Sequence, residues 1–400
     1  MTATSTAPLG LASDAEAILV ARRFAQVIAP GVIDRDRSGT VPAAELAEFD
    51  ASGLLAITAP RAYGGADVSM VTLAEVIRTI AAVDPAIAQV PQGHFLMVDV
   101  LAVWGTERQR RILFEEVVAG GRLGNALAER GGRHAQDLRT RLQGGRRLDG
   151  RKYYCTGGLT ARWLAVSALD DEDRVVLAFV RRDADGVTLD EDWNTMGQRA
   201  TVSGSASFSD VEVDPELVIP YHEAFNVPQQ LGARAQLVHA AIQVGIAGGA
   251  LRDAGEFVRT RARPFFEAAR AGWADTAAED VHTIGRYGRL AARVRAAETL
   301  LSDAATTQDA IGRRPADADA AARGSVAVAQ AKAFGSEVAV EVASDLFALT
   351  GASAADERYD LSRHWRNART HASHDPVDWK YHHIGNFLLN DALPPNHGQL

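Results

Sequence analysis

The spacing of hydrophobic and polar positions divides the chain into three regions. Up to about residue 120, apolar residues recur every three or four positions, which indicates amphipathic helices. Short runs of β-forming residues then alternate with Gly and Asp turns, which is typical of strands. After residue 220, long helical patterns return. We therefore expect a mainly α chain with a central β domain, divided into an N-terminal helical domain (1–120), a middle β domain (121–220) and a C-terminal four-helix bundle (221–400).

The bundle is predicted from three long helical patterns, at 235–263, 283–310 and 317–349, and one further helix. That helix is expected to begin at Pro376, because proline suits the first helical turn and disfavours the α conformation at the residue before it. Asp375 would then be its N-cap.

Composition and charge narrow the class of protein. The chain has 400 residues, of which 47% are hydrophobic and 23% charged, an ordinary globular composition. A net charge of -9 without a basic face argues against a nucleic-acid partner. No apolar run reaches the roughly 18 residues of a membrane span, and residues 1–17 lack the basic and apolar regions of a signal peptide. The single Cys155 excludes an internal disulfide and fits a cytoplasmic location.

Histidine, aromatic and arginine residues gather near the C-terminus. Six of the eleven histidines lie between His364 and His397, interleaved with tryptophan and arginine. A pocket for a planar, partly anionic ligand needs this mixture. His371 and His374 lie just before the expected Pro376 helix, where a turn would present both side chains into a cavity. The alternative, which spacing leaves open, is that these histidines pack and hydrogen-bond in an aromatic core.

Other chemistries lack their motifs. His371 and His374 have no HExxH pairing and Cys155 has no partner, so a metal site is not predicted. The glycines of 245–250 have a dinucleotide-like spacing, but they lie in a helical pattern with no strand before it, which indicates close helix packing. There is no Walker loop and no GxSxG nucleophile elbow.

The remaining candidates are far apart in the sequence. Asn125, Tyr154 and Thr156 lie on strand-like segments, Trp193 follows them, and Arg263 ends the first long helical pattern. Taken one by one, each residue is more often structural. The pattern alone predicts an enzyme with a pocket between domains, but it does not predict the reaction.

Several segments together resemble the acyl-CoA dehydrogenase superfamily along nearly the whole chain. The segments that carry the resemblance are 57–69, 123–129, 151–158, 194–213 and 349–371. The resemblance implies an acyl-CoA dehydrogenase-like fold: a helical domain, a β barrel-like domain and a four-helix bundle, assembled as a homotetramer with flavin at the domain junction.

The finer resemblance is to the flavin-dependent monooxygenase branch, which includes SfnB-like sulfur-acquisition oxidoreductases and dibenzothiophene monooxygenases. It is carried by 92–95, 192–199, 259–269 and 277–290, and above all by the long, unusual segment 363–390. This branch implies a role in sulfur metabolism.

The resemblance implies a role for each of the separated candidates. Asn125 matches a position that faces the flavin. Tyr154 and Thr156 match an aromatic-x-Thr strand against the isoalloxazine ring. Trp193 matches an aromatic residue near the flavin pocket. Arg263 matches an arginine that reaches the flavin phosphate, often across a subunit boundary.

The same resemblance places two histidines beside the reactive edge of the ring. His371 and His374 match a pair that lines the active site, with His374 also close to the flavin. Asp375 and His94 are further candidates for the substrate pocket. For His94, a core or loop position is the open alternative.

One departure from the dehydrogenase pattern bears on the reaction. Many acyl-CoA dehydrogenases carry a Glu in a Tyr-Glu-Gly-Thr stretch that removes the α-proton of the substrate. Here the stretch is His374-Asp375-Pro376-Val377. Asp375 is one methylene shorter, and as an N-cap it would bond backbone N–H groups, which lowers its basicity. Proton abstraction from an acyl thioester is therefore poorly supported.

The reaction implied by the branch is that of a two-component, FMNH2-dependent monooxygenase. A separate NAD(P)H:flavin reductase supplies reduced FMN by diffusion, O2 forms a C4a-hydroperoxyflavin, and one oxygen atom passes to sulfur or nitrogen of a small organic substrate. Asn125 and Thr156 would hydrogen-bond the ring edge, and His371 and His374 would donate to the peroxide or protonate the departing oxygen. The alternatives are an FAD-dependent acyl-CoA dehydrogenase or oxidase, and a flavin-storing paralogue without turnover.

Overall fold

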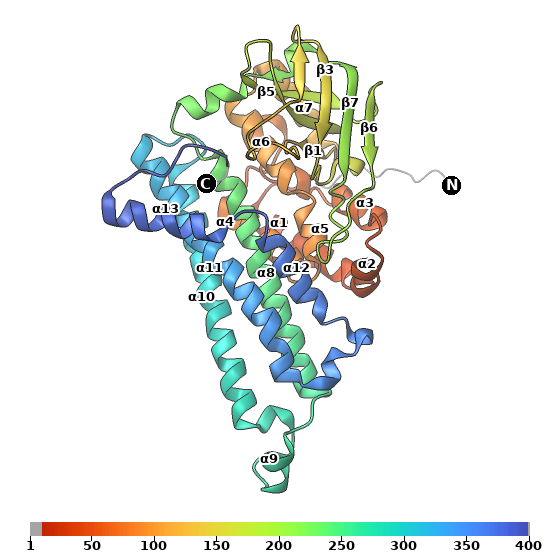
Figure 1. Cartoon of the computed structure of the whole chain (residues 1–400), viewed down its shortest axis with the longest axis vertical. Helices are drawn as coiled ribbons and strands as arrows, with labels where there is room; N and C mark the ends of the chain where they lie inside the picture. Colours follow the sequence, from red (N-terminus) through yellow and green to blue (C-terminus); the bar gives the residue numbers. More distant parts are fainter. Residues whose placement is uncertain (1–9, 399–400) are drawn as a thin grey trace.

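The computed structural model describes residues 10–398, so residues 1–9, on which part of the signal-peptide argument rests, lie outside it. A β sheet lies at one end of an elongated molecule, and long helices extend from it to the opposite end (Figure 1). The predicted fold class, mainly α with a central sheet, is confirmed. The strands run from Leu123 to Ile219, while the exact domain boundaries at 120 and 220 stay a prediction.

The N-terminal helices begin at polar caps and bury apolar faces. The Ser13 and Ser69 hydroxyls accept backbone N–H groups at the starts of α1 and α4, and the Asp84 carboxylate does so at α5. The helices are α1 (Asp14–Ile28), α2 (Val32–Ser38), α3 (Ala43–Ala51), α4 (Met70–Ala81), α5 (Pro85–Gln89), α6 (Gln92–Trp104) and α7 (Glu107–Val118).

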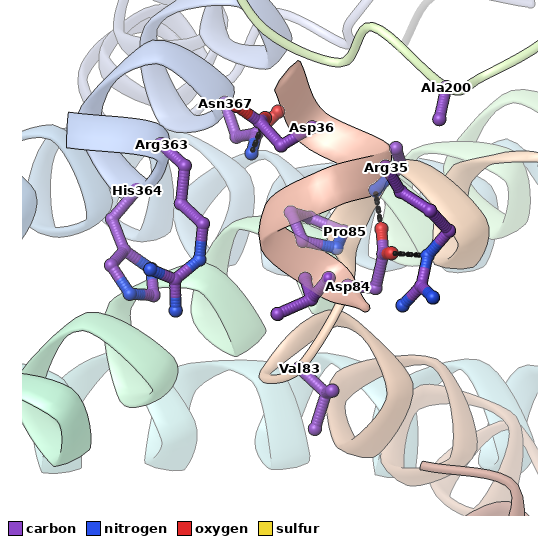
Figure 2. Close-up of a pocket in the computed structure, with 11 residues that line it drawn as sticks. Arg35, Asp36, Val83, Asp84, Pro85, Ala200, Arg363, His364 and Asn367 are labelled. Carbon is purple, nitrogen blue, oxygen red and sulfur yellow. Dashed lines mark hydrogen bonds and ion pairs between the residues drawn. The ribbon is translucent and has the colours of Figure 1, made fainter. Parts of the chain in front are cut away.

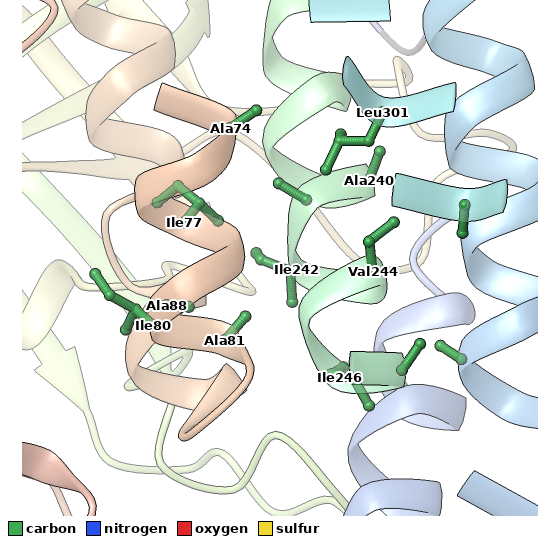
Figure 3. Close-up of a cluster of buried hydrophobic side chains, with 14 of the residues drawn as sticks. Ala74, Ile77, Ile80, Ala81, Ala88, Ala240, Ile242, Val244, Ile246 and Leu301 are labelled. Carbon is green, nitrogen blue, oxygen red and sulfur yellow. The ribbon is translucent and has the colours of Figure 1, made fainter. Parts of the chain in front are cut away.

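The largest hydrophobic cluster joins α4 to α8 (Leu231–Thr260), where isoleucine and alanine side chains face one another (Figure 3). Two glycines of α8 permit this approach. A Cβ added at Gly245 would lie 2.6 Å from the Ala81 Cβ, and one at Gly249 would lie 2.4 Å from the Ala82 carbonyl oxygen. Gly245 and Gly249 therefore serve close helix packing, as predicted, whereas a Cβ at Gly248 would meet no atom within 4 Å.

An eight-stranded sheet forms the β domain, in the order β6-β7-β3-β2-β4-β5-β8, with β1 parallel to β4. Asn125 of β1 is in register with Ala165 of β4, and β1 also packs against α6. This register places Asn125 between the sheet and the N-terminal helices. The strands are β1 (Leu123–Ala126), β2 (Arg141–Gln143), β3 (Arg147–Lys152), β4 (Trp163–Leu169), β5 (Val175–Arg181), β6 (Val187–Asp190), β7 (Ser205–Glu212) and β8 (Val218–Ile219).

The C-terminal region contains α8, α9 (Phe266–Arg270), α10 (Val281–Ile311), α11 (Ala318–Thr350), α12 (Ser362–Ala372) and α13 (Val377–Asn390). The sequence pattern predicts the fourth helix from Pro376 but does not predict α12, which precedes it. In the structure, α12 packs against both α8 and α11, whereas α13 packs on α11 and runs across the long helices (Figure 1). The chain therefore turns sharply between α12 and α13, close to His374.

One stretch of the described chain, Pro85–Trp104, is apolar and long enough to cross a membrane by length and composition. The sequence pattern predicts no such run. In the structure, 89% of its most apolar window is buried inside the protein, as in the core helices of globular proteins.

Candidate active site

Residues 89–93, where α5 meets α6, contact both the β domain and α12. The Gln89 Oε1 atom lies 3.1 Å from the His371 Nε2 atom. A Cβ added at Gly157 would lie 3.0 Å from the Val90 carbonyl oxygen, and one at Gly93 would lie 3.0 Å from the Asn125 Cβ. This one segment therefore brings Asn125, the loop after β3 and the end of α12 into one region.

Asn125 contributes an unsatisfied acceptor to this region. Its side-chain Oδ1 atom is buried and has no hydrogen-bond partner among residues 10–398. Leaving a buried amide oxygen unpaired costs about 1–3 kcal/mol, so the position favours a ligand that donates a hydrogen bond.

Thr156 is buried at the start of a chain of hydroxyl groups. Its Oγ1 atom lies 2.8 Å from the Ser203 Oγ, which lies 2.8 Å from the Thr201 Oγ1. Thr201 donates in turn to the Gln198 carbonyl oxygen at 3.0 Å. The chain ties the loop after β3 to the segment before β7 and fixes the position of the Thr156 hydroxyl.

Tyr154 and Trp193 form an aromatic pair beside these hydroxyls. Their rings meet edge to face, with centroids 6.1 Å apart, and the Trp193 Nε1–H donates to the Gln198 carbonyl oxygen at 2.7 Å. Tyr154 has a φ of 57°, unusual for a non-glycine residue, and the residue is 45% exposed. Trp193 also lines a shallow pocket with Val41 and Val202. Trp193 thus offers aromatic surface to a planar ligand, whereas the Arg130 guanidinium carbon lies over the Tyr154 ring, 4.8 Å from its centroid.

Three histidines meet at the end of α12. The His371 Nε2 atom lies 3.2 Å from the Nδ1 atom of His239 on α8, and the His239 and His374 rings lie with centroids 4.2 Å apart. Burial, together with neighbouring positive charge, holds the pKa values of His239 and His371 well below the usual range. Desolvation also lowers the pKa of His374, although its side chain is 45% exposed. All three are therefore neutral near pH 7.

Asp375 does not cap the following helix, contrary to the sequence-based expectation. The helix begins at Val377 with Pro376 at the N-cap position and no side-chain cap. The Asp375 carboxylate instead pairs with Lys332 of α11 and, at 2.9 Å, with Lys380 of α13. Burial opposes ionisation, but the hydrogen bond to His374 and the two lysines hold the pKa of Asp375 well below its usual range. Its low basicity therefore comes from the His374 hydrogen bond and two buried ammonium groups rather than from backbone N–H groups.

Lys332 is a counter-ion of Asp375, and no sequence motif marks it. It is 3% exposed, contacts both Gln236 and Asp375, and burial lowers its pKa to about 8. No three His, Cys, Asp or Glu side chains of residues 10–398 are arranged to hold a metal ion.

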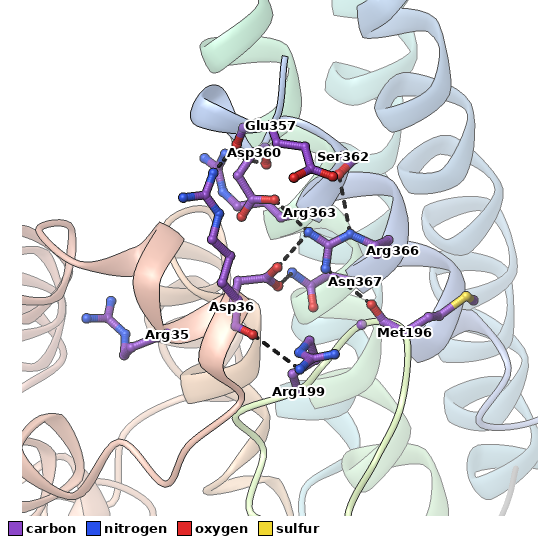
Figure 4. A network of polar contacts seen from close by, with 12 residues as sticks. Arg35, Asp36, Met196, Arg199, Glu357, Asp360, Ser362, Arg363, Arg366 and Asn367 are labelled. Carbon is purple, nitrogen blue, oxygen red and sulfur yellow. Dashed lines mark hydrogen bonds and ion pairs between the residues drawn. The ribbon is translucent and has the colours of Figure 1, made fainter. Parts of the chain in front are cut away.

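A polar network fixes α12 against α2 and the β6–β7 connection (Figure 4). Arg366 pairs with Asp36 at 2.6 Å and with Asp360 at 2.7 Å, and its guanidinium also donates to the Met196 carbonyl oxygen at 3.2 Å. Asn367 donates to Asp36 at 3.2 Å. Because α12 is held in this way from two sides, His371 at its last turn has a defined position.

A small pocket beneath this network lies between α2, α5 and α12 (Figure 2). Its polar groups are already paired: Arg35 with Asp84 at 2.9 Å, and His364 with Asp253 at 2.9 Å. Because these pairs link neighbouring helices, we assign the pocket a structural role rather than a ligand-binding one.

His94 lies in the core rather than on an open pocket. It is fully buried, its Nε2 atom lies 2.8 Å from the Leu55 carbonyl oxygen, and its Nδ1 atom accepts the Leu123 N–H at 3.1 Å. Both nitrogens are thus used by the backbone, and burial lowers the pKa of His94 to about 4. This geometry favours the core alternative over the substrate-pocket hypothesis.

Arg263 is exposed in the loop that follows α8. His239 and the last residue of α8, Thr260, are separated by roughly 30 Å along the helix, at about 1.5 Å per residue. The structure therefore does not bring Arg263 to the histidine cluster of its own chain.

Comparison with known proteins settles the family. Family models described as acyl-CoA dehydrogenase, N-terminal domain and acyl-CoA dehydrogenase, C-terminal domain match residues 16–121 and 237–379. Dibenzothiophene monooxygenase of Rhodococcus erythropolis is 32% identical over 96% of this chain and 95% of its own. The chain belongs to the flavin-dependent monooxygenases of the acyl-CoA dehydrogenase family.

Two further similarities support this monooxygenase family. The chain is 33% identical to a probable FMNH2-dependent monooxygenase, SfnC, of Pseudomonas putida, over 94% of this chain and 96% of that protein. The crystal structure of FMN-bound TdsC from Paenibacillus sp. A11-2 superposes with a TM-score of 0.91 at 30% identity, covering 96% of this chain and 100% of that one.

The site's side chains fit the flavin that this monooxygenase family uses. A reduced isoalloxazine ring carries N–H donors. Within the described chain the Asn125 Oδ1 is a buried acceptor without a partner, and the buried His371 Nδ1 also has no partner. Tyr154 and Trp193 form an aromatic pair that is tied to the Thr156 hydroxyl chain through the Gln198 carbonyl oxygen. The donor and acceptor types therefore match the ring.

Sequence reasoning missed Gln89, His239 and Lys332. His239 and Lys332 occupy ordinary positions within long helical patterns, and Gln89 ends a short helix, so no local motif marks any of them. Only the packing of α5, α8 and α11 against the end of α12 brings them to His371 and Asp375.

Proposed function

We propose that this chain is the oxygenase component of a two-component system that inserts one atom of O2 into a small organic substrate. Reduced FMN arrives from a separate NAD(P)H:flavin reductase and supplies the two electrons and the reaction with O2. One oxygen atom goes to sulfur or nitrogen of the substrate, and the other leaves as water. The observation that carries the proposal is a pair of buried polar atoms without a partner in the described chain, Asn125 Oδ1 and His371 Nδ1, at the junction of the β domain and α12.

The β-domain residues are proposed to bind and orient the ring. Asn125 accepts a hydrogen bond from a ring N–H, and the Thr156 hydroxyl, held by Ser203, contacts the ring edge. Tyr154 and Trp193 cover one face of the flavin ring and keep water away from that face.

The histidines are proposed to manage the protons of the reaction. A neutral imidazole both donates and accepts a hydrogen bond, and a lowered pKa keeps His371 and His374 in this form near pH 7. His374, the more exposed of the two, is placed to exchange a proton with the substrate side. The pairing of Asp375 with Lys332 and Lys380 makes it a fixed anion that holds this turn in place, so the acyl-CoA dehydrogenase alternative lacks a base here.

Arg263 is proposed to act in a neighbouring copy of the chain. Because it lies far from its own histidine cluster, contact with a flavin phosphate requires a partner, which fits a homotetramer. A homotetramer and a cytoplasmic location both remain our predictions.

The test is turnover with reduced FMN in the presence of O2 and a panel of substrates: dibenzothiophene, an alkyl sulfide, a sulfone and an amine. We expect oxygenated product from one sulfur or nitrogen substrate, with FMN preferred to FAD. His374→Ala should retain FMN binding, lose product and release more hydrogen peroxide, whereas the exposed His134→Ala should behave as wild type. Unchanged product yield in His374→Ala would remove the role assigned to His374, and acyl-CoA oxidation by the wild type would overturn the proposal.

A further inference from the structure

The two ring nitrogens of His371 have different environments. The Nε2 atom lies 3.1 Å from the Gln89 Oε1 and 3.2 Å from the His239 Nδ1. The Nδ1 atom is buried and has no hydrogen-bond partner within residues 10–398. One side of the ring is therefore held by the protein, and the other is left for a ligand.

The hydrogen positions follow from the chemistry of the partners. The amide oxygen of Gln89 can only accept a hydrogen bond, so the His371 Nε2 must carry the hydrogen. A neutral imidazole has one N–H, which leaves a lone pair on Nδ1. The His239 Nδ1 is then a second acceptor for the same N–H.

We propose that Gln89 is a positioning residue that holds His371 as the Nε2–H tautomer, so that its Nδ1 lone pair faces the bound flavin or substrate as an acceptor. The identity of that ligand rests on the proposed function. Under this assignment, His371 accepts a hydrogen bond or a proton at Nδ1 while Gln89 stabilises the ring from the opposite side. Proton exchange on the substrate side then falls to His374, whose Nδ1 lies 3.5 Å from the Asp375 carboxylate.

Charged and titratable groups surround His371 from three sides. His239 faces it from α8, Lys332 lies nearby on α11, and His374 and Asp375 lie in the turn after α12. The positive charge of Lys332 disfavours a second cation, whereas Asp375 favours one. Gln89, being neutral, fixes the tautomer without adding charge.

The tautomer is measured directly by NMR of 15N-histidine-labelled, flavin-free protein, with His371→Ala to assign the signals. We expect the wild type to show a protonated Nε2 and an unprotonated Nδ1 at His371. Gln89→Leu should lose this single tautomer and give a mixture. Gln89→Glu should keep it and move the protonation of His371 to higher pH, by about one unit or more, because a carboxylate beside Nε2–H favours the cation.

Product yield in matched variants distinguishes a positioning role of Gln89 from a general loss of structure. Gln89→Leu should lower the yield of product per FMNH2 at least several-fold, and Gln89→Glu should recover yield with the acid limb of its pH profile shifted upward. Gln92→Leu is the matched control, because Gln92 is a buried glutamine of the same segment that donates to the Ala235 carbonyl oxygen at 3.4 Å and does not contact His371. It should leave the His371 tautomer unchanged.

A protonated Nδ1 in the wild type, or an unchanged tautomer in Gln89→Leu, overturns this inference whatever the activity. Failure of the wild type to oxygenate any substrate in the panel overturns the proposed function instead. The two failures are distinguishable, because the NMR measurement needs neither flavin nor O2.

Discussion

His94 and His371 are both buried histidines with lowered pKa values, yet they differ in what their nitrogens do. His94 is fully buried and has both nitrogens bonded to backbone groups of Leu55 and Leu123. His371 is 5% exposed and, within the described chain, has one nitrogen held by the protein and the other without a partner. Burial and a shifted pKa are therefore shared by a structural and a candidate catalytic histidine, and the free nitrogen distinguishes them.

The largest effect is expected from His371→Ala. Removing the acceptor at the ring edge should lower oxygenation by about 10²-fold or more, while peroxide release rises and FMN affinity changes little. The free energy of unfolding should change less than in the His94 variant. The measurement is product and hydrogen peroxide per FMNH2 consumed. Equal loss of FMN binding and oxygenation would make His371 a structural residue like His94.

His94→Ala should act on stability instead. Loss of the ring leaves the Leu55 carbonyl oxygen and the Leu123 N–H without their partner, at a combined cost of about 3 kcal/mol. Urea unfolding measures this cost, and product yield per folded, FMN-bound molecule should stay near that of the wild type. If His94→Ala keeps the wild-type urea midpoint but loses oxygenation, His94 has a role in the active site.

Lys332→Met should shift the pH dependence of the reaction. Lys332 lowers the pKa values of His371 and His374 by charge repulsion, so its removal raises both. The acid limb of the oxygenation profile should move to higher pH by on the order of one unit. Lys152→Met is the matched control, because Lys152 is also a buried lysine, paired with Glu129 at 2.7 Å in the β domain. A shift of the same size in both variants would rule out a local effect.

The smallest effect for a single residue is the pH dependence of stability. His94, His239 and His371 stay neutral when folded, whereas unfolded histidines take up protons near pH 6.5. The unfolded state then binds more protons, so stability falls as the pH drops through 6.5, by about 1 kcal/mol for each histidine between pH 7.5 and 5.5. Urea unfolding at the two pH values measures the loss. In His94→Ala, the loss of stability between the two pH values should be smaller by the contribution of one histidine. A urea midpoint that does not change with pH would contradict the lowered pKa values.

The order of the elements could be predicted from the sequence because hydrophobic spacing is set locally. The helical period up to residue 120 and the alternating runs before Ile219 correspond to helices and strands in the structure. The close packing at Gly245 was likewise predictable, since glycines in a helical pattern permit helices to approach.

The site could be predicted only in part. His371 and His374 were marked by an unusual local composition, but the role of Asp375 was wrong, because the lysines that pair with it come from α11 and α13. Proline and aspartate at a helix start give the same local signal whether the carboxylate caps the helix or binds a distant ammonium group. Gln89 carried no signal at all, since its role depends on a contact 282 positions away in the chain.

The most direct test is a crystal structure of the protein with FMN bound. The account predicts that the isoalloxazine ring lies within hydrogen-bonding distance, about 3.5 Å, of Asn125 Oδ1, with the His371 Nδ1 facing its reactive edge. A ring bound elsewhere, or a His371 turned so that Nδ1 faces the protein, would contradict it.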